Sequence, residues 1–349
     1  LLKLVSAGIM PATADLMRQG VLRRMRATLP EISSVSWTSF MTGKNPGRHG
    51  IFGFVDLLPG SYRLHFPNSM DLKSPTVFDR LAKEDRRVAV LNLPGTYPAR
   101  PFPGVLVCGF VALDLEKAVY PNRLLPYLRE IGYRIDVDAS KGKHNNAEFL
   151  SELNYSLCVK RQLLHKIWLE EEWDLFVLVV TETDRLQHFF YNAIGNPRHP
   201  CHEQTDDFFR QLDELVADMI RLVDKEDECP LFLLSDHGFY PLKQEVNLNP
   251  LLRKAGFGGA RVNKDFTGIE VKMDCKAFAV DPSRIFVHER GRFPGGGVKR
   301  GDVQSVKEEL RAFLLELKFN GEHVIQEVFE KKDLYQGPQT HRAADLILL

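Results

Sequence analysis

Two Asp/His pairs, each directly after an apolar stretch, are the residues of this sequence best suited to chemistry. The first pair is Asp184 and His188, and the second is Asp236 and His237. Side chains four residues apart share one helix face, whereas an adjacent pair reaches one ion only from an irregular strand end. Carboxylate and imidazole ligands without thiolate suit zinc, and also manganese or iron. A surface Asp beside a satisfied His explains one such pair, but two pairs after two strands predict a hydrolase with two divalent metal ions.

Hydroxyl side chains cluster upstream, at the start of a helix that we predict over 35–42 and that Gly43 ends. Such hydroxyls usually cap a helix, so most of Ser33, Ser34 and Ser36 are expected to be structural. One of them can be a nucleophile, because helix amides favour phosphate and a metal ion favours the alkoxide. Lys44 follows this helix and is either a weak phosphate contact or a solvated turn residue.

The elements that must position these residues alternate between apolar strands and amphipathic helices. Strands are predicted at 87–93, 173–180 and 230–235, and helices at 12–25, 74–81, 147–172 and 201–225. This alternation predicts an α/β fold with a parallel sheet and right-handed crossovers, whose chemistry lies beyond the carboxyl ends of the strands. The looser pattern at about 94–143 indicates a cap insertion, and the Gly-rich stretch at about 239–298 indicates hairpins, with turns at 257–259 and 294–297.

Bulk properties exclude several classes of protein. The 349 residues have a formal net charge of zero, so we expect no nucleic-acid polymer as a partner. Five scattered cysteines without a CxxC pair favour reduced thiols and a cytoplasmic location. No apolar run approaches the roughly 20 residues that span a bilayer. The chain starts without Met and ends in an apolar run, so both ends look cut, and the absence of a signal peptide is no evidence about location.

Three separated motifs carry a resemblance to a known family. The run SWTSFMTGKNPGRHGIFGF, together with TETDRLQH and LSDHGF, resembles the type I phosphodiesterase/nucleotide pyrophosphatase family of the alkaline phosphatase superfamily. The likeness extends from residue 10 to about 345. It implies an alkaline-phosphatase-like three-layer sandwich, with a mostly parallel central sheet, helices on both faces and inserted cap elements. It also implies that residues 1–349 form one catalytic domain, truncated at both ends.

The resemblance also implies a mechanism. Members hydrolyse phosphoric esters or anhydrides through a covalent enzyme intermediate, with two metal ions that are usually zinc. Their nucleophile lies four residues before the position of Trp37, which gives the role to Ser33, with Ser34 and Ser36 as rivals for nucleophile or phosphate contact. By the same resemblance, Asp184 and His188 bind the first metal, and Asp236 and His237 bind the second. Ser33 attacks phosphorus, and a metal-bound water then hydrolyses the phospho-enzyme.

Two departures from the family pattern affect the metal sites. The family has an Asp after an N-terminal first strand and a further His near the C-terminus. The chain begins after the position of this Asp. His341 matches the family's His poorly, because it precedes rather than follows the apolar run 345–349. We therefore expect one ligand of each metal to be missing and the chain as given to be inactive by itself.

The family resemblance leaves the substrate open. A phosphodiesterase or nucleotide pyrophosphatase acting on a small-molecule phosphoester or nucleotide is the first hypothesis. A phosphomonoesterase or phosphate-transfer enzyme on the same scaffold is the second, and a degenerate binding module without catalysis is the third. Substrate identity and oligomeric state do not follow from the sequence.

Overall fold

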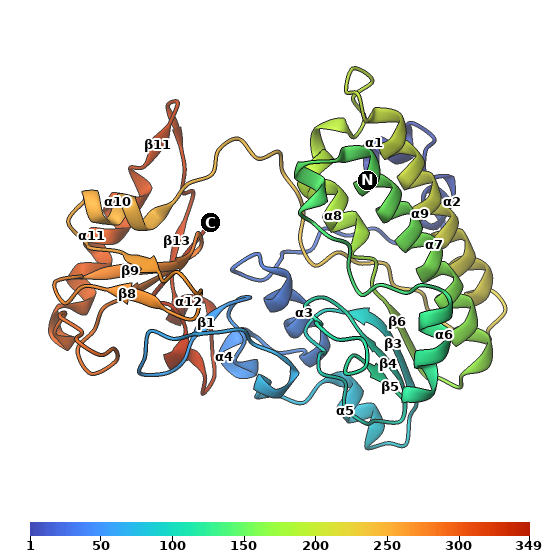
Figure 1. The fold of residues 1–349 in the computed structure, drawn as a ribbon, viewed down its shortest axis with the longest axis horizontal. Helices are drawn as coiled ribbons and strands as arrows, with labels where there is room; N and C mark the ends of the chain where they lie inside the picture. Colours follow the sequence, from blue (N-terminus) through green and yellow to red (C-terminus); the bar gives the residue numbers. More distant parts are fainter. The chain divides into compact units, whose positions relative to one another are not determined.

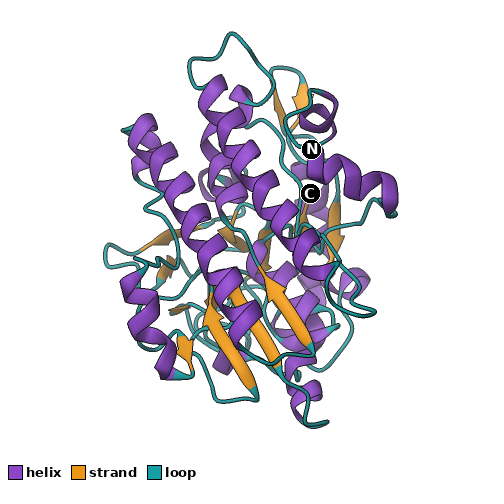
Figure 2. Ribbon diagram, turned by 90° about the vertical axis from the view of Figure 1, so that its right-hand side faces the viewer, coloured by secondary structure: helices purple, strands orange, loops and turns teal.

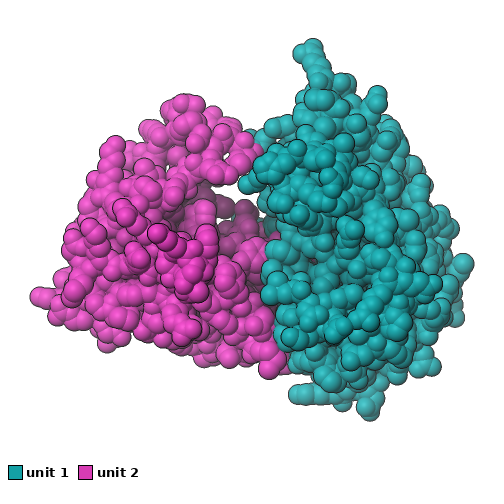
Figure 3. Space-filling view, in the orientation of Figure 1, with its two compact units in different colours: residues 1–26, 78–241 teal, residues 27–77, 242–349 magenta.

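The computed structural model describes all 349 residues, which form two compact units. Unit 1 consists of residues 1–26 and 78–241, and unit 2 of residues 27–77 and 242–349 (Figure 3). Each unit is therefore built from two stretches that are far apart in the sequence. The prediction of a single domain with a cap insertion at about 94–143 stays a prediction.

Unit 1 is an α/β unit whose sheet has the order β5-β4-β3-β6 (Figure 1). The strands are β3 (Val88–Leu93), β4 (Gly104–Cys108), β5 (Val119–Tyr120) and β6 (Leu175–Leu178). Strand β3 pairs in parallel with β4 and β6, and β5 pairs antiparallel with β4. Every residue of β3 is buried, as expected for an apolar strand inside a parallel sheet. The predicted α/β class with a mostly parallel sheet is confirmed.

The helices of unit 1 pack against this sheet and against one another (Figure 2). They are α1 (Leu2–Ser6), α2 (Pro11–Gln19), α5 (Val77–Ala82, at the boundary with unit 2), α6 (Leu125–Glu130), α7 (Asn146–Glu170), α8 (Glu182–Phe190) and α9 (His202–Val223). Trp168 of α7 and Leu222 of α9 pack with Phe176 of β6. The Asp213 carboxylate of α9 accepts hydrogen bonds from the first amides of α2, at 2.8 Å from both Ala12 N and Thr13 N. This carboxylate therefore satisfies helix amides that have no intrahelical partner.

Unit 2 surrounds a four-stranded antiparallel sheet of order β13-β14-β10-β9. Its strands are β1 (Asp56–Leu57), β2 (Leu64–His65), β7 (Ala260–Val262), β8 (Ile269–Val271), β9 (Ala277–Asp281), β10 (Arg284–Val287), β11 (Lys318–Phe319), β12 (Glu322–His323), β13 (Val328–Glu330) and β14 (Leu346–Leu348). Its helices are α3 (Ser33–Thr42), α4 (Pro46–His49), α10 (Leu248–Lys254), α11 (Val303–Leu315) and α12 (Lys331–Leu334). Leu310 and Leu314 of α11 pack on Ile285 and Leu346 of the sheet. The buried Arg284 pairs with Asp56 and Asp281, at 2.5 and 2.6 Å.

Three predicted elements are wrong. The helix expected over 12–25 ends at Gln19, because Gly20 adopts an extended conformation. The strand expected over 230–235 is absent, and the side chains of Phe232 and Leu233 are 81% and 61% exposed. An apolar run forms a strand only where it pairs with another strand, and this run does not pair with the edge strand β6, whose one partner is β3. Residues 257–259 form the turn from α10 into β7 rather than the turn of a hairpin.

None of the helices is both long enough and apolar enough to cross a membrane.

Candidate functional site

The two predicted Asp/His pairs lie together in unit 1. Asp184 Oδ2 is 3.5 Å from His188 Nε2, and Asp184 Oδ1 is 3.7 Å from His237 Nε2. Asp236 Oδ2 is 3.5 Å from the same His237 Nε2. The structure therefore gathers four side chains that are separated by up to 53 positions in the sequence.

The local fold explains how the first pair is presented. The Val179 amide donates to Leu91 O at 2.9 Å, which extends the pairing of β6 with β3 up to the turn that leads into α8. Helix α8 then starts at Glu182, so Asp184 and His188 are one helical turn apart on one face. Asp236 and His237 arrive instead from the irregular stretch that follows α9.

Phe239 joins this cluster, although no role was predicted for it. Its ring centroid lies 5.0 Å from that of His188 and 5.4 Å from that of His237. The ring packs edge-on against the His188 imidazole and tilted against the His237 imidazole, which restricts the orientations open to both. An aromatic residue two positions after an Asp-His pair was the available signal for this contact.

The donor set of the cluster fits a divalent metal ion. Asp236 Oδ2 is buried and accepts no hydrogen bond, and a buried carboxylate oxygen without a donor is costly unless a cation satisfies it. Two carboxylates and two imidazoles are oxygen and nitrogen ligands of the kind that zinc, manganese and iron accept. In the structure, no group of three or more His, Cys, Asp and Glu side chains is arranged to hold a metal ion. Metal binding by these four residues therefore stays a prediction.

Arg185 places a positive charge beside this cluster. Its NH1 atom is 3.5 Å from Asp184 Oδ2, and its NH2 atom is 2.5 Å from Asp136 Oδ2. The guanidinium carbon also lies 4.4 Å from the ring centroid of Phe110. Both Phe110 and Asp136 belong to the stretch 94–143 that was predicted as a cap insertion, so this stretch contacts the residue next to a predicted ligand.

The hydroxyl cluster belongs to unit 2, at the start of α3. Ser33 is the first residue of the helix, and the N-cap is Ile32, so Ser33 does not cap the helix as a preceding hydroxyl would. The Ser36 hydroxyl lies 2.8 Å from that of Thr28, whereas Ser34 Oγ is buried without a hydrogen-bond partner. Of the two rivals of Ser33, Ser36 is therefore engaged inside the unit and Ser34 has an unused hydroxyl.

A buried imidazole supports the other end of α3. His49 is fully buried, and burial lowers its pKa to about 3. The Ile51 amide donates to His49 Nδ1 at 3.2 Å, so the neutral ring carries its proton on Nε2 and donates to Ser39 Oγ at 3.0 Å. His49 thus connects the turn after α4 to the helix that carries Ser33.

The other predicted residues of unit 2 are less well placed. Lys44 is exposed and follows the C-terminal end of α3, so it lies about 15 Å along the helix axis from Ser33. It is therefore the weakest of the predicted phosphate contacts. His341 is exposed and donates from Nδ1 to Pro338 O at 2.8 Å.

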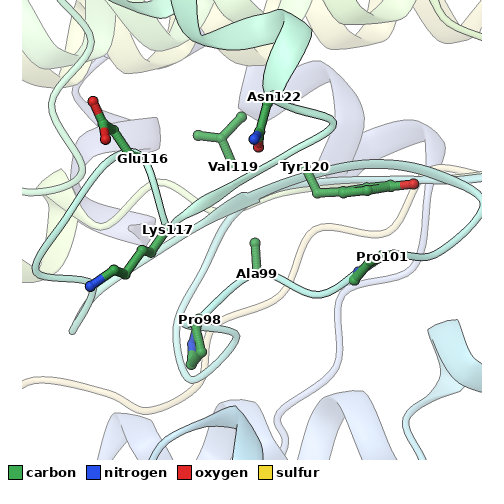
Figure 4. Close-up of a pocket in the computed structure, with 8 residues that line it drawn as sticks. All are labelled: Pro98, Ala99, Pro101, Glu116, Lys117, Val119, Tyr120 and Asn122. Atoms are coloured by element: carbon green, nitrogen blue, oxygen red, sulfur yellow. The ribbon is translucent and has the colours of Figure 1, made fainter.

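Unit 1 also contains a hollow of about 530 Å³ that includes none of the predicted site residues (Figure 4). Its lining comes from the loop before β4 and from the stretch around β5: Pro98, Ala99, Pro101, Glu116, Lys117, Val119, Tyr120 and Asn122. This lining combines one acid and one amine with mostly apolar groups and contains no candidate nucleophile beside a base. The Asp/His cluster is therefore the better candidate for chemistry, although none of its residues lines this hollow.

Comparisons with known proteins identify the family and the fold of this chain. A family model described as "Type I phosphodiesterase / nucleotide pyrophosphatase" matches residues 2–349. Two solved structures of phosphonoacetate hydrolase from Sinorhizobium meliloti 1021, in complex with phosphonoformate and with phosphonoacetate, share the fold with TM-scores of 0.60 and 0.59. Their sequence identities are 17% and 16%, and each match covers 99% of this chain and 76% of the other. A search of curated protein sequences finds no match. The predicted alkaline-phosphatase-like fold is confirmed.

Proposed function

Because the chain belongs to the type I phosphodiesterase/nucleotide pyrophosphatase family, we propose that it hydrolyses phosphoric diesters or nucleotide pyrophosphates with Ser33 as its nucleophile. Membership makes the chain a hydrolase of phosphoester bonds, in a family whose members depend on metal ions. The identity of the nucleophile, the number and kind of metal ions and the class of ester are parts of the proposal.

The convergence of Asp184, His188, Asp236 and His237 is the observation that carries this proposal. These side chains come from two separate motifs, and one of their carboxylate oxygens is buried without a hydrogen bond. They would hold two divalent ions, with zinc preferred and manganese or iron as alternatives. When bound, such ions neutralise charge on a phosphoryl group and favour the ionised form of an attacking hydroxyl.

Ser33 then carries the covalent chemistry in this proposal. Its Oγ attacks phosphorus, the P–O bond to the leaving alcohol or phosphate breaks, and the hydroxyl proton leaves to solvent. Water later cleaves the phosphoserine and regenerates the hydroxyl. The amides at the start of α3 stabilise the anionic phosphoryl group, and the unused Ser34 hydroxyl supplies a further contact.

A small phosphorus-containing molecule is the proposed substrate. The two structural neighbours are complexes with phosphonoformate and phosphonoacetate, both small anions. The formal net charge of zero offers nothing to a nucleic-acid polymer. We place the protein in the cytoplasm, which is consistent with five free cysteines.

A direct assay tests this function. The purified full-length gene product is given bis(p-nitrophenyl) phosphate, p-nitrophenyl phosphate or phosphonoacetate, with zinc or manganese. We expect faster turnover of the diester, and we expect Ser33→Ala to lower it at least about 1,000-fold. Ser34→Ala is the matched control and should have a much smaller effect.

Other outcomes assign other functions. Preference for the monoester would make the protein a phosphomonoesterase or phosphate-transfer enzyme. Absence of any metal-dependent turnover would favour a binding module that has lost catalysis. Full activity of Ser33→Ala together with an inactive Ser34→Ala variant would transfer the nucleophile to Ser34.

A further inference from the structure

A buried ion pair lies beneath the turn that leads to Asp184. Lys160 of α7 and Glu182, the first residue of α8, have side chains that are only 1% and 2% exposed. Lys160 Nζ is 2.7 and 2.8 Å from the two carboxylate oxygens of Glu182. The Ser156 hydroxyl, one turn earlier on α7, also donates to Glu182. Three charged or polar groups are thus withdrawn from water two residues before a predicted metal ligand.

The same turn is held from a second direction by Asn92. This residue ends the regular pairing of β3 and has a φ of +62°, a conformation that few residues other than glycine adopt. Its Nδ2 donates to Val179 O at 3.1 Å and to Thr181 Oγ1 at 3.2 Å. Lys160 Nζ reaches the same Thr181 hydroxyl at 3.2 Å. Residues 179–182 are therefore fixed by side chains of both β3 and α7.

Stability alone does not explain this arrangement. Removing two charges from water costs so much free energy that replacing a buried ion pair by apolar side chains is often neutral or stabilising. What such a pair does provide is a single relative position for the two elements that carry it, since any displacement leaves a charge buried alone. Here that position sets where α8 begins and hence where Asp184 and His188 point.

We propose that Lys160 and Glu182 are positioning residues, which hold the first turn of α8 so that Asp184 is presented to the metal-binding cluster. The benefit to metal binding rests on the proposed function. The order that the ion pair gives to the first turn of α8 does not depend on that function. Groups that hydrogen-bond a metal ligand directly typically change the affinity of a metal site by about 10- to 100-fold when they are removed, and a pair that acts through the turn should give an effect at the lower end of this range.

The test replaces both charges by apolar groups in Lys160→Met/Glu182→Leu. The partly exposed Lys166 and the exposed Glu170 of the same helix, 2.5 Å apart, provide the matched control Lys166→Met/Glu170→Leu. Amide hydrogen exchange is measured in the metal-free protein at Arg185, whose amide donates to Thr181 O at 3.1 Å and closes the first turn of α8. Thermal unfolding and zinc affinity are measured on the same samples.

We expect the buried double variant to unfold near the wild-type temperature, to exchange the Arg185 amide at least about tenfold faster, and to bind zinc about tenfold more weakly. Wild-type exchange at Arg185 in a stable double variant would overturn the inference. If that variant does not fold, Glu182→Gln keeps the size of the side chain and removes its charge, and unchanged exchange there would overturn the inference equally. Full-length wild-type protein that binds no zinc would contradict the proposed function, while the exchange result would still decide the role of the ion pair.

Discussion

The Asp/His cluster of unit 1 and the hydroxyl cluster of unit 2 are stabilised by opposite means. The cluster of unit 1 brings two carboxylates to one imidazole and leaves a carboxylate oxygen without a donor. The turn that leads to Asp184 is supported by the buried ion pair of Lys160 and Glu182. The hydroxyl cluster lies on one continuous helix, supported by neutral hydrogen bonds through Thr28 and His49.

The difference reflects the chemistry expected of each region. Ligands for a cation repel one another until the cation arrives, so the protein has to hold them together against that repulsion. A nucleophilic hydroxyl is neutral before it reacts, so the protein has to orient it but does not have to hold it against electrostatic repulsion. Charge substitutions should therefore affect the first region through metal binding, and hydrogen-bond substitutions should affect the second through folding stability.

Loss of one ligand charge should have the largest effect. Asp236→Asn keeps the shape of the side chain and removes its charge, so we expect diester turnover to fall by about 1,000-fold and zinc affinity by at least about tenfold. The metal-free variant should be as stable as the wild type or more stable. In the wild type the negative charges of Asp184 and Asp236 both lie beside His237 and repel each other, and the substitution removes this repulsion. Kinetics, calorimetric titration and thermal unfolding measure the three quantities.

Asp207→Asn, an exposed carboxylate on α9, is the control and should change none of the three. A variant at Asp236 that retained both turnover and zinc affinity would remove this residue from the site.

The second-largest effect should be the pH dependence of the stability of unit 2. Burial lowers the pKa of His49 to about 3 from its ordinary 6.5, so the unfolded chain binds a proton that the folded chain does not across that interval. The contribution of His49 is complete above pH 6.5 and is lost as the pH falls towards 3. Between pH 7 and pH 4 the loss is on the order of 3 kcal/mol in the free energy of unfolding.

Urea unfolding of the wild type and of His49→Gln, followed from pH 7 to pH 4, measures this contribution. The wild type should lose stability more steeply than the variant, which lacks the titrating group. If the free energy of unfolding changed equally with pH in both proteins, the pKa of His49 would be the same in the folded and unfolded states.

The smallest effect concerns the hydroxyl pair of Ser36 and Thr28. Ser36→Ala removes a hydrogen bond of 2.8 Å and should lower the free energy of unfolding by about 1 kcal/mol. Combined with Thr28→Val in a double-mutant cycle, most of that loss should appear as coupling between the two residues. An Ser36→Ala variant of unchanged stability but without turnover would instead show that Ser36 acts on the substrate.

Sequence patterns predicted most of unit 1, because its elements have strong periodicity. The strand over 87–93 and the long helices over 147–172 and 201–225 are confirmed to within a few residues. The strand over 230–235 failed because an apolar run specifies a strand only together with a partner, and no partner is visible in a local pattern.

The candidate site was predicted through its motifs, but its support was not. Asp184 and His188 were readable from spacing on one helix. The role of Lys160 could not be read in the same way, since an isolated lysine on a helix is usually solvated. Its signal was its position, because Ser156, Lys160 and Leu164 share the buried face of α7.

The division into two units also constrains how the protein is made. The chain passes between the units three times, near residues 26, 77 and 241, and the segment 27–77 is completed only by residues 242–349. On the ribosome, the helix that carries Ser33 is made before residues 242–349, so its unit cannot close until those residues are synthesised. A nascent chain therefore exposes this segment while residues 78–241 are being made, and it needs chaperone protection during that time.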